Sequence, residues 1–201
     1  MKITLLTAAS KEYWEVLKLS APNKLEYCLR HGLQLSVRQH EALNLAQERN
    51  AIMREELENC HWLAFMGADT LIMNHRIDLR LYTDNDYDMI IGKDIHGINN
   101  DVFFLKDGAS SRAFLRNVSN TLYSLGGNDQ DAMQRVIEDS PDFKVKYVHQ
   151  RLFNSYLYSE YSYPDDRMGS YQAGDFLLHL PGIPNTRRIE IMKEYLGKVI
   201  K

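Results

Sequence analysis

One aspartate in the first half of the chain follows a short apolar run and is well placed to do chemistry. The run is Trp-Leu-Ala-Phe-Met at residues 62–66, and Gly67, Ala68 and Asp69 follow it directly. An apolar run of this length, bounded by polar residues and a glycine, is typical of a buried strand. Parallel sheets present their ligand sites at the carboxyl ends of the strands, so Asp69 is placed to hold a metal ion or a substrate. The alternative is a turn aspartate that caps the next segment.

Three other polar residues have both a structural and a functional interpretation. Asp129 and Gln130 stand where a helix is predicted to begin, and acidic residues suit that end of a helix. Arg49 lies on the predicted helix before the apolar run, and a guanidinium group is able to hold a phosphate or a hydroxyl group. A solvated helix face explains Arg49 equally well.

Composition limits the classes of protein that fit this chain. Its 201 residues, 44% of them hydrophobic, fit one domain with a sizeable core. The 24 basic and 27 acidic residues give a net charge of -3, which argues against a nucleic-acid partner. Cys28 and Cys60 show neither metal spacing nor a disulfide framework, so a reducing, cytoplasmic location is expected. The first apolar residues are too few for a signal peptide, and no run approaches the ~20 residues of a membrane span.

Periodicity in the first half predicts the elements that position Asp69. The predicted elements are a strand at 3–7, a helix capped by Ser10, a second helix from Ser20 to Gly32 with Pro22 in its first turn, a strand at 33–37, a helix at 42–58 and a strand at 62–66. This alternation predicts an α/β fold with a largely parallel sheet.

The pattern changes after residue 74. We expect strands at 87–91 and 101–106 separated by a loop at 92–100, helices at 110–124 and from 128, a strand at 144–149, an irregular segment at 151–172, a strand at 176–180 and a closing helix at 186–200. Asp69 and His179 then stand at strand ends of one sheet, and we expect their side chains to converge at one cleft.

Five blocks of sequence occur in a characteristic order and spacing. They are Thr7-Ala8-Ala9; Asn23-Lys24 with Tyr27 and His31-Gly32-Leu33; residues 62–74; Gly97-Ile98-Asn99 through Phe104-Leu105 with Asp129-Gln130; and Gly174-Asp175-Phe176 with His179 and Gly182. Together these blocks resemble the GT-A glycosyltransferases of the galactosyl/xylosyl type, glycosyltransferase family 34, over nearly the whole chain. The resemblance implies a single GT-A (Rossmann-like) domain over residues 1–201, with a mixed, mostly parallel sheet flanked by helices. Residues 1–106 would mainly bind a nucleotide sugar, and residues 107–201 would mainly form the acceptor side and closing elements.

The resemblance also implies an activity. A retaining glycosyltransferase would move a sugar from a nucleoside diphosphate, such as UDP-galactose or UDP-glucose, to a hydroxyl of a glycan acceptor. The alternative is a GT-A-like nucleotide-sugar or glycan-binding protein with little or no transferase activity. Gly67 and Asp101 favour this alternative, because each departs from the family pattern.

Site residues follow from the resemblance, position by position. The donor-binding residues would be Thr7, Ala8, Arg49, Gly67, Ala68, Asp69, Asn99 and Gly182. Gln130 would stabilise the oxocarbenium-like centre, and Asp129 would hold sugar hydroxyls. The acceptor proton would pass to the departing phosphate, so no dedicated protein base is required.

The metal site implied by the resemblance contains Asp69 and His179, with Mn²⁺ or Mg²⁺ as the cation. Gly67 stands where the family's Asp-x-Asp pattern has its first acid, and Asp101 stands where a glycine is expected. Two alternatives therefore remain open for the metal. Asp69 binds it together with the diphosphate and His179, or the site works with little metal. The alternative for His179 is a core histidine among apolar neighbours.

Tyrosines crowd the irregular segment near the end of the chain. They are Tyr156, Tyr158, Tyr161, Tyr163 and Tyr171. Long loops on rigid scaffolds often carry binding function, and aromatic rings with a polar tip make platforms for sugar faces. A hydrophobic flap over the sheet edge, or an oligomer contact, is the alternative.

Overall fold

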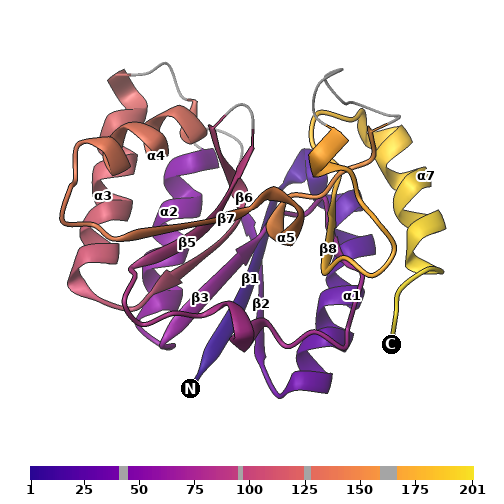
Figure 1. The fold of residues 1–201 in the computed structure, drawn as a ribbon. Coiled ribbons are helices and arrows are strands. Elements are labelled where there is room, and N and C mark those ends of the chain that lie inside the picture. Colours follow the sequence, from indigo (N-terminus) through magenta and orange to yellow (C-terminus); the bar gives the residue numbers. More distant parts are fainter. Residues whose placement is uncertain (41–44, 95–96, 125–127, 159–166) are drawn as a thin grey trace.

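A mixed sheet forms the centre of the molecule (Figure 1). The computed structural model describes residues 1–40, 45–94, 97–124, 128–158 and 167–201. Within this part of the chain, six strands form one sheet in the order β2-β1-β3-β6-β5-β7. Their bounds are β1 Ile3–Ser10, β2 Gln34–His40, β3 Trp62–Met66, β5 Met89–Asp94, β6 Gly97–Lys106 and β7 Val145–His149. The pairs β1/β2, β1/β3 and β5/β7 are parallel, whereas β6 runs antiparallel to β3 and β5. The predicted α/β class with a mixed, mostly parallel sheet is confirmed.

Helices cover both faces of this sheet (Figure 1). Their bounds are α1 Trp14–His31, α2 Leu45–Leu57, α3 Ala109–Ser124, α4 Asp129–Glu138, α5 Gln150–Phe153 and α7 Asn185–Leu196. One face packs against α2, α3 and α4, and the other packs against α1 and α5, with α7 beside α1. No helix in the described parts of the chain combines the length and apolar character needed to cross a membrane.

The strands at the centre of the sheet are apolar on both faces because helices cover both sides. Every residue of β1 and β3 is buried. Side chains alternate between the two faces, so Leu6 and Phe65 pack on the side of α2 and α3, whereas Leu5 and Ala64 pack on the side of α1. A continuous apolar run is the expected sequence of such a strand. The predicted strand at 62–66 has the bounds observed for β3.

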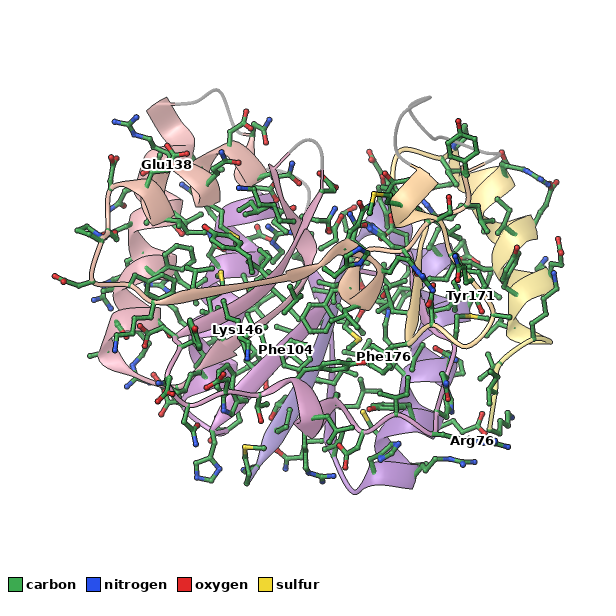
Figure 2. The ribbon with its side chains drawn as sticks, in the orientation of Figure 1. Arg76, Phe104, Glu138, Lys146, Tyr171 and Phe176 are labelled. Atoms are coloured by element: carbon green, nitrogen blue, oxygen red, sulfur yellow. The ribbon has the colours of Figure 1, made fainter. Side chains whose placement is uncertain are left out.

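A second, smaller sheet lies beside α1 and carries part of the site. It pairs β4 (Thr70–Ile72) with β8 (Leu177–His179) in antiparallel register, with Thr70 opposite His179. The expectation that Asp69 and His179 belong to one sheet is therefore wrong. The chain turns at residues 67–69 and leaves the large sheet, so β8 pairs with β4 instead. Phe176, just before β8, packs in the same apolar cluster as Phe104 of the large sheet (Figure 2).

A single helix replaces the two that were predicted between Ser10 and Gly32. Ser10 ends β1 without capping through its side chain, a short 3-10 turn follows, and α1 then runs without a break through Pro22 to His31. Pro22 is exposed, so the carbonyl that loses its helical partner there can bond to water. Gly32 has a φ of 60° and ends the helix, as predicted.

Most of the predicted loop at 92–100 is a hairpin in the structure. β5 extends to Asp94 and β6 begins at Gly97, with Lys93 paired to Ile98 and Asp94 to Gly97. The predicted loop is wrong for most of these residues, because backbone pairing between the two strands continues through them. Within β6, Asp101 lies alongside the end of β3, where its carbonyl accepts from the N–H of Gly67 at 2.8 Å.

Candidate active site

The carboxyl ends of three parallel strands meet at one edge of the large sheet and border a cavity. β1 ends at Ser10, β2 at His40 and β3 at Met66. The cavity has a volume of about 270 Å³. It is lined by Ala8, Ala9, Ser10, Tyr13, His40, Arg49, Phe65, Gly67, Ala68, Asp69, Asp101 and Asp129. Five of the predicted donor-binding residues, Ala8, Arg49, Gly67, Ala68 and Asp69, are in this lining.

A buried lysine, Lys24, holds the turn that carries Asp69 through hydrogen bonds. Nζ of Lys24 donates to the carbonyl of Gly67 at 2.7 Å, to Oγ1 of Thr7 at 3.3 Å and to Oγ of Ser20 at 3.2 Å. The hydroxyl of Thr70 donates to the same Gly67 carbonyl at 2.8 Å. Burial lowers the pKa of Lys24 to about 7, against a smaller opposing effect of Asp69. The backbone of the turn is therefore fixed independently of any ligand.

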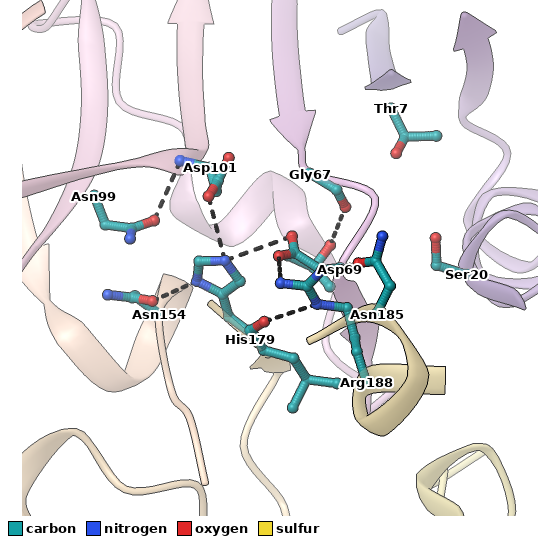
Figure 3. A network of polar contacts seen from close by, with 12 residues as sticks. Thr7, Ser20, Gly67, Asp69, Asn99, Asp101, Asn154, His179, Asn185 and Arg188 are labelled. Carbon is teal, nitrogen blue, oxygen red and sulfur yellow. Dashed lines mark hydrogen bonds and ion pairs between the residues drawn. The ribbon is translucent and has the colours of Figure 1, made fainter. Parts of the chain in front are cut away.

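Asp69 lies between two cationic side chains (Figure 3). Its Oδ1 is 3.6 Å from Nε2 of His179, and its Oδ2 is 3.3 Å from Nη2 of Arg188. Burial favours the neutral carboxyl, but His179 and then Arg188 outweigh it and hold the pKa of Asp69 below its usual range. Arg188 is itself buried and is fixed by the carbonyl of Leu180 at 3.0 Å and the side chain of Asn185. Asp69 is thus ionised and held in one orientation.

His179 presents one ring nitrogen to two carboxylates. Nδ1 and Oδ1 of Asn154 are 2.6 Å apart, so Nδ1–H donates to that amide oxygen and Nε2 faces Asp69 and Asp101. Nε2 lies 3.4 Å from Oδ2 of Asp101 and has no hydrogen-bond partner. Burial lowers the pKa of the imidazole, but the two carboxylates raise it to about 9. Asp69 and His179 therefore converge, as expected.

These side chains fit a divalent cation. One ligand atom from each of Asp69, Asp101 and His179 lies within 4.8 Å of the others. Carboxylate oxygens and imidazole are suitable ligands for Mn²⁺, and carboxylates suit Mg²⁺. The hydrogen bond from Nδ1 to Asn154 leaves Nε2 as the nitrogen that could bind a metal ion, and most metal-bound histidines are oriented by such a bond. The buried Nε2, which makes no hydrogen bond but faces two carboxylate oxygens at 3.4 and 3.6 Å, is the observation that favours an ion here.

Arg49 joins the cavity to the start of α4. Its Nη2 is 2.7 Å from Oδ2 of Asp129, its Nη1 is 3.9 Å from Oδ1 of Asp101, and its guanidinium lies 5.1 Å from the centre of the Phe65 ring. Nε of Arg49 is buried without a partner. The alternative of a solvated helix face is wrong, because Arg49 is only 8% exposed. Asp129 lines the cavity, whereas Gln130 follows it on the helix and is not in the lining.

Three predicted donor-binding residues lie outside the cavity lining. Thr7 is buried and accepts a hydrogen bond from Lys24. Asn99 accepts a hydrogen bond from the backbone N–H of Asp101 at 3.2 Å. Gly182, with a φ of 67°, lies in the turn between β8 and α7. These three positions support neighbours of the cavity or stand near them, and direct donor contact by them stays a prediction.

Sequence reasoning missed several residues of the site. Ser10 and His40 end strands at the cavity, and the position of His40 at a parallel strand end was a usable signal. Burial lowers the pKa of His40, and its Nδ1 is buried without a partner. Arg188 had no signal, because one arginine on a closing helix usually faces solvent. Asp101 was visible only as a departure from the expected glycine.

The tyrosine-rich segment is described only in part, and Tyr161 and Tyr163 lie outside the described residues. Tyr156 is buried, and Tyr171 packs edge-on against Tyr195 of α7 with ring centres 5.8 Å apart. These two rings are therefore packing residues, which fits the alternative of a flap better than that of a sugar platform.

Comparison with known proteins identifies a family and a fold. Residues 80–190, more than half of the chain, match the model of the galactosyl transferase GMA12/MNN10 family. No curated protein matches the chain.

Similar solved structures include a glycosyltransferase involved in glycosylation of the major capsid of PBCV-1, with a TM-score of 0.77, 16% identity and coverage of 96% of this chain and 100% of that one. The glycosyltransferase GlyE of Streptococcus pneumoniae TIGR4 has a TM-score of 0.63 and 11% identity, over 97% of this chain and 60% of that one. The galactosyltransferase LgtC, solved with donor and acceptor sugar analogues, has a TM-score of 0.55 and 14% identity, over 98% and 96%. The fold is therefore GT-A, as the resemblance implied.

Proposed function

We propose that this chain, a glycosyltransferase that belongs to the galactosyl transferase GMA12/MNN10 family, transfers a hexose from a nucleoside diphosphate to a hydroxyl of a glycan acceptor. The proposed donor is a UDP-hexose such as UDP-galactose or UDP-glucose, and the anomeric configuration is retained. The observation that carries the proposal is the cavity at the strand ends, where three carboxylates and Arg49 surround a space of about 270 Å³.

Small residues leave room for the nucleotide at the end of β1 and in the turn that follows β3. Ala8, Ala9 and Ala68 line the cavity with little side chain, so a ligand can approach the backbone closely. We assign the base and ribose to these two segments, with backbone N–H and C=O groups as hydrogen-bond partners. Arg49, already fixed by Asp129, then faces the phosphates or a sugar hydroxyl.

A cation is needed because the cavity is rich in carboxylates. Asp69, Asp101 and Asp129 all line it, and a diphosphate beside them is repelled unless positive charge lies between. Asp69 and His179 are the proposed protein ligands for Mn²⁺ or Mg²⁺. When bound, the cation supplies Lewis-acid stabilisation of the charge that builds on the departing diphosphate. Asn154 keeps the His179 ring oriented, and Arg188 fixes the second oxygen of Asp69.

The transfer step needs no protein base in this proposal. The acceptor oxygen forms a bond to the anomeric carbon while the bond from that carbon to the phosphate oxygen breaks. The acceptor's proton passes to the departing phosphate oxygen, so the charges balance. Asp129 holds sugar hydroxyls at the cavity wall, and Gln130, one residue further on α4, stabilises the positive charge at the anomeric carbon. Residues from 107 onward form the acceptor side.

A thermal-shift screen of sugar nucleotides, with and without Mn²⁺, tests the proposal. A ligand that binds only the folded protein stabilises it by about 2.7 kcal/mol at a concentration of a hundred times Kd. We expect UDP-hexoses to raise the melting temperature, and to raise it further with Mn²⁺. If no nucleoside-diphosphate sugar shifts the melting temperature under either condition, the proposal fails. Binding without UDP release in the presence of acceptors would instead favour a sugar-nucleotide-binding protein.

A further inference from the structure

We infer that Asp101 is the second carboxylate ligand of the cation, supplied from the neighbouring strand in place of the acid missing at position 67. The inference rests on the proposed function and names a ligand that neither the family match nor the fold assigns. The resemblance described under Sequence analysis implies a first acid on the turn after β3. In this chain that position is Gly67, and the acid stands on β6.

Positions 67 and 101 face one another across two antiparallel strands. Met66 pairs with Val102, and the N–H of Gly67 donates to the carbonyl of Asp101 at 2.8 Å. A Cβ atom added to Gly67 would lie 3.3 Å from Oδ1 and 3.4 Å from Cβ of Asp101, and 3.1 Å from Oδ1 of Asp69. A side chain at position 67 would therefore crowd the carboxylates of both Asp69 and Asp101.

The glycine at position 67 is explained by this crowding and by no backbone requirement. Among the described glycines, those with positive φ are Gly32, Gly97, Gly174 and Gly182. Gly67 is not one of them, so other residues can adopt its backbone conformation. A second acid at position 67 would put two carboxylates directly opposite each other, which is destabilising. One acid at this pair of positions is the arrangement that fits.

The two departures from the family pattern therefore compensate each other. An acid is lost at position 67 and gained at position 101, where the pattern has glycine, so the number of carboxylates beside Asp69 is unchanged. Oδ2 of Asp101 lies 3.4 Å from the unpartnered Nε2 of His179, and Asp69, Asp101 and His179 each offer a ligand atom within 4.8 Å of the others. Asp101 thus presents its carboxylate to the proposed cation site from β6, instead of from the turn after β3.

Binding of Mn²⁺ to the purified protein, without donor, tests this inference through a readout that does not depend on turnover. Free Mn²⁺ is measured by electron paramagnetic resonance for wild type, Asp101→Asn, Asp101→Gly and the double variant Gly67→Asp/Asp101→Gly. Asp142→Asn, at an exposed acid in the turn before β7, is the charge-matched control. Melting curves confirm that each variant is folded.

Asp101→Asn and Asp101→Gly should each weaken Mn²⁺ binding at least about tenfold, because even outer-shell partners of a metal typically contribute that much. Asp142→Asn should bind as wild type does. The double variant should bind more tightly than Asp101→Gly, since it restores a second carboxylate beside Asp69 and lacks the contacts that Asp101 makes with position 67. The inference is overturned if Asp101→Asn binds Mn²⁺ as tightly as wild type, if the double variant binds no better than Asp101→Gly, or if wild type binds no Mn²⁺.

Donor binding separates this inference from the proposed function. If UDP-hexoses bind and turn over in wild type while Asp101→Asn leaves Mn²⁺ affinity unchanged, the transferase proposal stands and Asp101 is not a ligand. If wild type binds neither Mn²⁺ nor any sugar nucleotide, both proposals fail together.

Discussion

At the scale of single residues, the site depends on side chains whose orientation is fixed by neighbours outside the cavity. Asn154 is one of these neighbours, and it orients His179. Its Oδ1 accepts from Nδ1 of His179, and its Nδ2 donates to Asp94 at 2.9 Å. The ring of His179 is therefore held from the β5–β6 hairpin through an amide that never reaches the cavity. Such outer-shell partners set both the tautomer and the direction of the ligand nitrogen.

Replacing Asn154 with alanine should weaken Mn²⁺ binding about 10- to 100-fold, the usual effect of losing an outer-shell partner. The remaining ligands are intact, so the loss reports the orientation of His179. Isothermal titration with Mn²⁺, below the melting temperature of the variant, measures the affinity. An unchanged affinity in the folded variant would mean that Asn154 does not position the ligand.

Lys24 gives a second residue-scale prediction, which concerns pH. Burial lowers its pKa to about 7 in the folded protein from 10.5 when exposed. Between these two values the unfolded chain binds more protons than the folded protein, so this lysine makes stability rise with pH in that window. Lys24→Met removes the contribution.

As pH rises from 7 towards 10.5, we expect the free energy of unfolding of wild type to increase relative to that of Lys24→Met. Urea unfolding at one pH below 7 and two within the window measures it. If the free energy of unfolding depends on pH in the same way in both proteins, the amine of Lys24 is not buried as described.

At the scale of elements, the start of α4 carries both proposed catalytic residues, and a cap fixes it. Oδ1 of Asn128 accepts from the backbone N–H groups of Gln130 and Asp131 at 3.1 and 3.3 Å. The same turn places Asp129 against Arg49. The Asn128 cap and the ion pair between Asp129 and Arg49 therefore hold the start of α4 beside the cavity.

Asn128→Ala should lower the free energy of unfolding by about 1 kcal/mol, because it leaves the first backbone N–H groups of α4 without their cap. Asn128→Asp, which keeps a capping oxygen, is the matched control and should stay close to wild type. Chemical denaturation of the three proteins measures the effect. Equal losses in both variants would indicate that the side chain matters for a reason other than capping.

Elements were predictable where the local pattern and the tertiary environment agree. The apolar run at 62–66 is buried on both faces, and its bounds are those predicted. Local signals misled where packing prevails. Pro22 predicted a helix start, but it is exposed and tolerated inside α1. A loop was predicted at 92–100, but pairing between β5 and β6 makes most of it strand.

At the scale of the whole molecule, the sequence predicted that Asp69 and His179 converge, but it did not predict the strand pairing that brings them together. Asp69 follows the predicted strand at 62–66 and His179 lies near the end of the predicted strand at 176–180, so both were expected at a strand end. The pairing of β4 with β8 outside the large sheet depends on where the chain turns after β3, and no local pattern records this. Arg188 and Asp101 reach Asp69 from α7 and β6, and such long-range contacts are visible only in the folded structure.

The central claim is that Asp69 and a divalent cation together support hexose transfer from a nucleoside diphosphate. The most direct measurement is UDP release from a UDP-hexose that binds in the thermal-shift screen, titrated with Mn²⁺ in wild type and in Asp69→Asn. The substitution keeps the size of the side chain but removes its charge. The account predicts release that rises with Mn²⁺ in wild type, is suppressed by a chelator and is lost in Asp69→Asn. UDP release that is the same in both proteins, and unaffected by Mn²⁺ or chelator, would contradict it.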